Sequence, residues 1–192
     1  MLFARLRHTL MAERGPGIGK HRLEALTDGV MAIAMTLLVL EIKVPDLPRK
    51  TPTEELLAHL GAHLPTFASF VLSFVMLGVF WLRHHQLHHW IKRVDGILLA
   101  LNLTFLAGVS FFPFVAAFFG RFSTNPLAQT LYMGDAALLV TTLTLQWVWA
   151  RRRDLLVPEL EAQQASLILR RTLAGNLAIV IFFGMAVLRF LD

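Results

Sequence analysis

The stretch that decides the fold runs from Arg22 to Val44 and reads RLEALTDGVMAIAMTLLVLEIKV. Its centre, residues 29–40, has no charged side chain, whereas acidic and basic residues stand at both ends. A helix of about 20 mostly apolar residues crosses the hydrocarbon core of a bilayer. Ionisable groups that remain within or beside such a helix mark an ion path or a fixed partner by default. The stretch therefore predicts a membrane helix that is more than an anchor.

The composition indicates an integral membrane protein. Of the 192 residues, 56% are hydrophobic and only 16% are charged, and the mean hydropathy is +0.60. A soluble domain of this length could not bury so much apolar surface. Apolar runs predict an all-α polytopic helical bundle that forms one transmembrane domain over residues 1–192. Its five predicted spans cover about residues 25–44, 60–83, 96–119, 127–150 and 171–190.

Lys and Arg are divided unevenly between the two sides of the predicted bundle. Thirteen lie before the first span or in connections on that same side, and five lie on the other side. Under the positive-inside rule, this places the amino-terminal segment, residues 1–20, in the cytoplasm. That segment has no apolar core of signal-peptide length, so no cleavable leader is expected. The chain is predicted to be a multi-pass protein of the plasma membrane. The basic residues are dispersed at membrane edges, and nucleic acid is not an expected partner.

The first predicted span has two distinct faces. At about 100° per residue, Ile33, Leu37 and Leu40 fall within about 60° of one another, and the Thr36 hydroxyl lies beside them. Asp28 falls almost opposite this stripe. The stripe and the carboxylate therefore serve different surfaces. Periodicity alone favours lipid contact or ordinary packing for the stripe over a pore lining.

Two motifs resemble a known family. The first is Arg22-x-x-x-Leu26-Thr27-Asp28-Gly29 with the apolar run that follows it, and the second is Trp81-Leu82-Arg83-His84-His85 with the turn at residues 92–95. Together they resemble the bacterial branch of the lysosomal potassium channel family called transmembrane protein 175, whose signature is Arg-x-x-x-Phe-Ser-Asp. The resemblance extends over the order of spans. The family subunit has six spans, whereas this sequence predicts five.

The resemblance implies a passive monovalent-cation channel that prefers potassium over sodium and also passes protons. It implies a homotetramer in which the first helix of each subunit lines a central pore. Carried over by position, the pore constriction would be Ile33, Leu37 and Leu40, and Thr36 would be the selectivity layer. A structural polar network would include Arg22, Thr27, Asp28, His84, His85 and Asp95.

Selection by a ring of backbone carbonyls is excluded by the sequence. That filter needs a Gly-Tyr-Gly type loop, and the only tyrosine, Tyr132, sits beside Met133 and Gly134 in a predicted span. Side chains must therefore select the ion, and hydroxyls suit a monovalent cation better than a divalent one. Glu41 at the outer mouth could concentrate cations. Pairing with Lys43 is an equally good explanation of Glu41.

Four histidines, at positions 84, 85, 88 and 89, form two i,i+4 pairs near the end of the second span. This spacing can hold zinc, but no carboxylate or thiolate accompanies it. Hydrogen-bonded histidines, with Asp28 or Asp95 as partners, are favoured over a metal site. We therefore expect no metal and no cofactor, with potassium as the permeant ion. Other polar residues in the spans are expected to bond between helices: Asn102, Thr104, Gln146 and Asn176.

Two other functions stay open. A proton- or ion-coupled secondary transporter could use Asp28 or Asp135 as its coupling group, since a lone acid in a span can bind a proton or an ion. A non-conducting scaffold could bind a partner through the basic loops. No catalytic constellation, phosphate loop or carboxylate pair indicates an enzyme.

Overall fold

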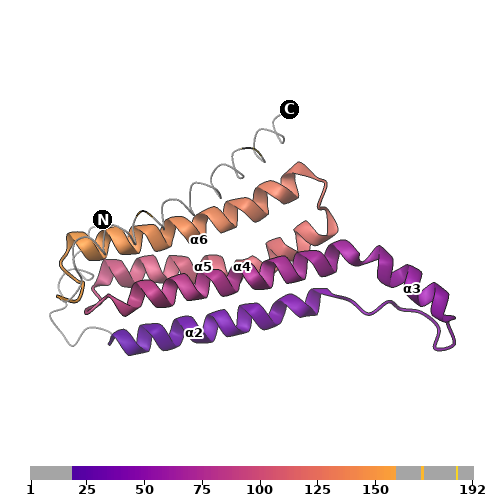
Figure 1. Cartoon of the computed structure of the whole chain (residues 1–192), viewed down its shortest axis with the longest axis horizontal. Coiled ribbons are helices and arrows are strands. Elements are labelled where there is room, and N and C mark those ends of the chain that lie inside the picture. Colours follow the sequence, from indigo (N-terminus) through magenta and orange to yellow (C-terminus); the bar gives the residue numbers. More distant parts are fainter. Residues whose placement is uncertain (1–18, 159–169, 171–184, 186–192) are drawn as a thin grey trace, which may run out of the picture.

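The computed structural model describes residues 19–158 together with Arg170 and Met185. The described chain is helical, and four long helices lie side by side while α3 projects beyond them at one end (Figure 1). The elements are α2 (Lys20–Leu37), η1 (Leu38–Glu41), α3 (Thr53–Ala62), α4 (Leu64–His89), α5 (Gly96–Arg121) and α6 (Pro126–Arg152). The predicted fifth span, apart from Met185, and nearly all of the predicted amino-terminal segment lie outside the described residues.

The chain runs up and down through the bundle. The end of η1, the start of α4 and the turn from α5 to α6 lie at one end, with α3, and we call this the α3 end (Figure 1). The opposite end carries the start of α2 and the turn after His89, and we call it the His-rich end. Successive long helices are therefore antiparallel neighbours.

Three helical segments of the described chain are long and apolar enough to cross a membrane: Lys20–Glu41, Leu64–His89 and Gly96–Arg121. The helix α6 is also long enough, with 27 residues. Its polar residues, among them Asp135 and Gln146, lower its hydropathy, and it is not among the three. A membrane crossing by α6 stays a prediction.

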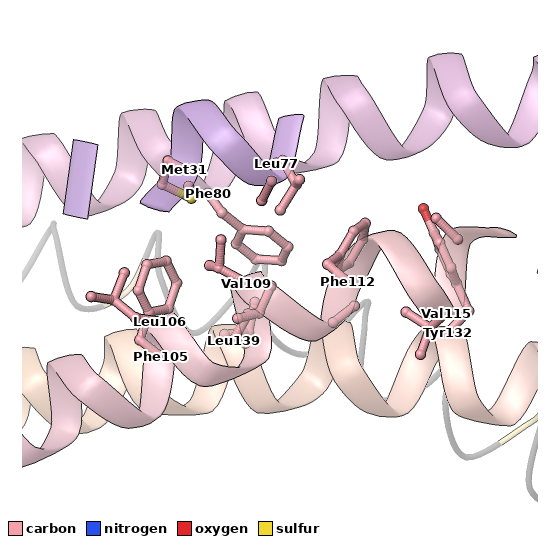
Figure 2. Packing of buried hydrophobic residues seen from close by; sticks show 14 of the residues in the cluster. Met31, Leu77, Phe80, Phe105, Leu106, Val109, Phe112, Val115, Tyr132 and Leu139 are labelled. Atoms are coloured by element: carbon pink, nitrogen blue, oxygen red, sulfur yellow. The ribbon is translucent and has the colours of Figure 1, made fainter. Parts of the chain in front are cut away.

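The helix α5 is the centre of the packing, because it contacts α2, α4 and α6. Phe105, Val109 and Phe112 are fully buried on it. Figure 2 shows these side chains between Leu77 of α4 and Leu139 of α6. In a membrane, such close packing replaces the hydrophobic driving force, since lipid is as apolar as leucine.

Gly108 lets α5 and α6 approach closely. A Cβ atom at this position would lie 2.8 Å from Cδ2 of Leu139, which is itself fully buried. Dispersion contacts weaken quickly when helices separate. A glycine at this position therefore lets α5 and α6 make closer contacts than a larger residue would.

We expect Gly108→Ala to lower the free energy of unfolding by about 1–3 kcal/mol, because the new Cβ would lie 2.8 Å from Cδ2 of the fully buried Leu139 and would force a shift in the packed interface. Gly78→Ala is the matched control in α4, since its Cβ would meet only Met35 Cε at 4.0 Å. That control should be neutral or stabilising by up to about 1 kcal/mol. Thermal unfolding in detergent checks both, and equal midpoints for the two variants would contradict the close-approach explanation.

Candidate functional site

The helix α2 buries one face against the rest of the described chain. The buried residues recur every three or four positions, which is the period of one helix face. They are Leu23, Thr27, Met31 and Ala34, continued by Leu38 of η1. These side chains pack toward α4 and α5, which α2 contacts. The rotation of α2 about its own axis is fixed by this face.

The predicted stripe lies on the face that the protomer leaves open. Ile33 and Leu40 are each 60% exposed and Leu37 is 42% exposed. Thr36 is exposed beside them. These side chains therefore point away from the core of the described chain.

The Thr36 hydroxyl is oriented by its own helix. Its Oγ1 donates a hydrogen bond of 2.8 Å to the backbone oxygen of Ile33. A hydroxyl has one hydrogen and two lone pairs. Since the hydrogen is committed to the backbone, the lone pairs are left for an outside donor or a cation.

A buried hydrogen-bond chain joins α2 to α5 and α4. Thr27 Oγ1 donates to Leu23 O at 3.0 Å and accepts from Asn102 Nδ2 at 3.1 Å. Asn102 Oδ1 lies 2.8 Å from His84 Nε2, and because an amide oxygen only accepts, the histidine donates. Thr27, Asn102 and His84 are each 3% exposed or less. We call these three residues the Thr27 chain.

The helix α6 is tied to the same region through a second histidine. The rings of His84 and His88 stack with centroids 3.9 Å apart, and His88 Nε2 lies 2.8 Å from Gln146 Oε1. The predicted interhelical bonds of Asn102 and Gln146 are thereby confirmed. Thr104 does not make one, because it is exposed and donates to Ala100 O of its own helix. Asn176 lies outside the described residues.

The predicted carboxylate partners of the histidines are wrong. Amide oxygens accept from His84 and His88, whereas Asp28 accepts from Trp81 Nε1 at 2.8 Å. A buried ion pair would have to repay the desolvation of two charges, and a neutral amide avoids that cost. The His85 ring stacks on Trp81, with centroids 5.8 Å apart.

The remaining predicted network residues are not joined to the Thr27 chain. Asp95 accepts from Leu98 N at 2.8 Å, which caps α5, and from Trp149 Nε1 at 2.9 Å. Arg22 is exposed, and the ion pairs of the described chain at this end do not include it. Sequence reasoning thus grouped residues that the structure places in four separate settings.

Glu41 ends η1 and is exposed. Within the described residues it forms no ion pair with Lys43, so the paired explanation of this carboxylate has no support in the structure. Both side chains line a cavity at the α3 end.

Asp135 lies in α6 beside Gly108 and is only 8% exposed. Its Oδ2 atom has no hydrogen-bond partner among the described residues. The described part of the chain also holds no group of three histidine or acidic side chains close enough to share a metal ion.

Comparison with known proteins shows the family of this chain. The family model for the endosomal/lysosomal potassium channel TMEM175 matches residues 22–113. A Streptomyces collinus protein named as a potassium channel is 34% identical over 171 residues, which cover 86% of this chain and 81% of the relative. The chain belongs to the TMEM175 family. The resemblance seen in the two motifs is therefore confirmed, and the family is one of ion channels rather than enzymes.

Other TMEM175 proteins agree. A Chamaesiphon minutus protein named as a potassium channel is 33% identical over 141 residues, covering 72% of this chain and 69% of that protein. The crystal structure of a lysosomal potassium-selective channel TMEM175 homologue from Chamaesiphon minutus gives a TM-score of 0.74 at 27% identity, over 88% of this chain and 87% of that chain. A crystal structure of the potassium channel MtTMEM175 matches at 19% identity with a TM-score of 0.59, which supports the fold alone.

We expect Asn102→Leu to lower the free energy of unfolding by about 1–3 kcal/mol, because it leaves the Thr27 and His84 groups buried without their partner. Thermal unfolding in detergent measures this, and Thr104→Val on the exposed side of α5 is the control, with a change below about 0.5 kcal/mol.

A double-mutant cycle of Asn102→Leu with His84→Phe tests the pairing itself. The two changes should be less than additive, with a coupling of roughly 0.5–1.5 kcal/mol. Full additivity would show that the 2.8 Å contact carries no free energy.

Proposed function

We propose that this protein is a potassium channel, in which four copies surround a central axis and α2 of each copy lines the conduction path. Membership of a channel family and two relatives named as potassium channels support this function. The observation that carries the assignment is the open face of α2. It presents Ile33, Leu37 and Leu40 away from the protomer, although its opposite face is fully buried.

Rings of these branched side chains would narrow the path and repel water. Hydrophobic constrictions of this kind gate channels by dewetting. For a single helix, contact of these apolar side chains with lipid would be as favourable as contact with other copies of the chain. Membership of a channel family supports self-association of the stripe over contact with lipid.

Thr36 would supply the selectivity layer. Four hydroxyl oxygens around an axis can replace part of the hydration shell of a monovalent cation. Because each hydroxyl hydrogen is held by Ile33 O, each ring position presents an oxygen lone pair and not a donor. The absence of a Gly-Tyr-Gly sequence leaves this side-chain ring as the available means of selection.

The polar groups of α2 would hold the pore helix rather than contact the ion. The Thr27 hydroxyl donates to Leu23 O and accepts from Asn102, and the Asp28 carboxylate accepts from Trp81. Both lie off the exposed stripe. Passive conduction then needs no coupling carboxylate and no cofactor, with potassium itself as the permeant species.

We also propose that the His-rich end faces the cytoplasm of the cell and that the α3 end faces outward. The excess of Lys and Arg in the connections at the His-rich end supports this orientation. Glu41 would then stand at the outer mouth, where an exposed carboxylate raises the local concentration of cations.

The chain has no cysteine, so a single introduced thiol reports only on its own position. We expect Leu40→Cys to form covalent dimers upon oxidation or with a short bis-maleimide, because copies of this residue would meet near the axis. Val71→Cys, 57% exposed on α4, is the control and should stay monomeric on a denaturing gel. Equal cross-linking at the two positions, or none at Leu40→Cys, would contradict the assembly.

We expect Thr36→Ala to reduce the potassium-to-sodium flux ratio by roughly threefold to tenfold, since it deletes one oxygen ligand from each subunit. Flux into liposomes from the purified protein measures this. Thr104→Ala is the matched control, because Thr104 is also exposed and also bonded to its own helix. Unitary currents distinguish a channel from a slow carrier, and a scaffold would give no flux at all.

A further inference from the structure

A cavity of about 630 Å³ opens at the α3 end of the bundle. Its lining comes from three membrane-length segments at the point where each begins or ends. Glu41 ends the first segment, Arg121 ends α5, and His63 directly precedes α4. The ends of these elements lie together in Figure 1. The cavity is therefore at the depth where hydrocarbon gives way to headgroups.

Two cations lie on the cavity wall. Lys43 and Arg121 are both exposed, and neither forms an ion pair with an acidic residue of the described chain. The Arg121 guanidinium lies 5.6 Å from the centroid of the Phe122 ring. Against these two cations stands the single carboxylate of Glu41, so the lysine, arginine and glutamate side chains of the wall leave an excess of one positive charge.

An aromatic ridge leads from the cavity along α5. Phe114, Phe118 and Phe122 follow at intervals of one helical turn, with ring centroids 6.2 Å and 5.0 Å apart. Phe111 extends the ridge, 5.1 Å from Phe114. From Phe111 to Phe122 a helix rises about 16 Å, which is half of the hydrocarbon thickness. Phe114 is 54% exposed, so the ridge is open to whatever lies beside it.

We propose that this cavity binds a phospholipid with an anionic headgroup. The phosphodiester would lie between Lys43 and Arg121, while one acyl chain would follow the phenylalanine ridge. A phosphoglycerol headgroup carries one negative charge on its phosphodiester, which matches the excess charge of the wall, and its two hydroxyls can donate to Glu41. Lipid binding at this site does not require α2 to line a pore.

A lipid fits the cavity better than a second copy of the chain or a soluble phosphate. A protein partner would leave Lys43 and Arg121 to be desolvated without a counter-charge, which is costly. A soluble phosphate would use the two cations but leave the apolar ridge empty. A lipid can fill both parts of the site at once. Its charged head would lie between the two cations, and its apolar tail would lie along the phenylalanine ridge.

The test is native mass spectrometry of the purified full-length protein with phosphatidylglycerol, phosphatidylethanolamine or phosphatidylcholine. The parent protein should retain phosphatidylglycerol in preference to the other two. Lys43→Gln with Arg121→Gln should lower the ratio of retained phosphatidylglycerol to phosphatidylcholine by roughly tenfold or more. Phe118→Ala should lower the retention of all three lipids.

Arg49→Gln with Lys50→Gln is the matched control. It removes one Lys and one Arg from exposed positions in the loop before α3 and should leave the lipid ratio within about twofold. Lys43→Gln alone changes an exposed position after η1 and should lower the ratio of retained phosphatidylglycerol to phosphatidylcholine by less than the double variant does. This single variant replaces the double variant in the test if the double variant does not fold. Equal loss in the two double variants, or equal retention of the three lipids, would overturn the site. Displacement by free glycerol phosphate would indicate a soluble ligand, and loss of assembly without loss of lipid would indicate a subunit contact.

Discussion

The arrangement of this bundle depends on the hydrogen bonds that join Thr27, Asn102 and His84. In water, each of these groups could exchange one partner for another at little net cost, but hydrocarbon offers no replacement. The three groups belong to α2, α5 and α4, and all are buried. A rotation of α2 by one residue position, about 100°, would expose Thr27 to lipid and leave Asn102 without its acceptor. The chain of bonds therefore favours the same rotation of α2 that the burial of Leu23, Met31 and Ala34 favours.

Once this rotation is set, the functional face of α2 follows without further interactions. Leu23, Met31 and Ala34 must point inward because they share the helix face of Thr27. Ile33 and Leu40, on another face, must then remain outside the protomer. The exposure of large apolar side chains on a helix buried on its other side is consistent with assembly. The hydrogen bonds of Thr27, Asn102 and His84 therefore determine in which direction the apolar stripe points.

Much of this could be predicted from the sequence because it depends on local periodicity. The apolar stripe, its separation from Asp28 and the length of the helices follow from residue spacing alone. The hydrogen-bond partners do not, since Thr27 and Asn102 are separated by 75 positions and nothing local relates them. Charge suggested Asp28 and Asp95 as partners for the histidines, but neutral amides accept those bonds, and the aspartates accept from Trp81 and Trp149 instead. Inside a membrane, the low cost of burying an amide outweighs the stronger attraction of a carboxylate.

The winding of the first membrane segment shows a further limit of sequence reasoning. A helical wheel assumes about 100° per residue and puts Leu37 and Leu40 about 60° apart. The chain instead tightens into a 3-10 turn over Leu38–Glu41, with Ile42 N bonded to Val39 O at 3.1 Å. A 3-10 helix has three residues per turn, so side chains three positions apart lie almost directly above one another. Leu37 and Leu40 are therefore closer to a single line along the helix than the wheel predicts, while Leu38 turns into the core. The tighter winding aligns the apolar stripe at the segment's end, where a constriction would need it.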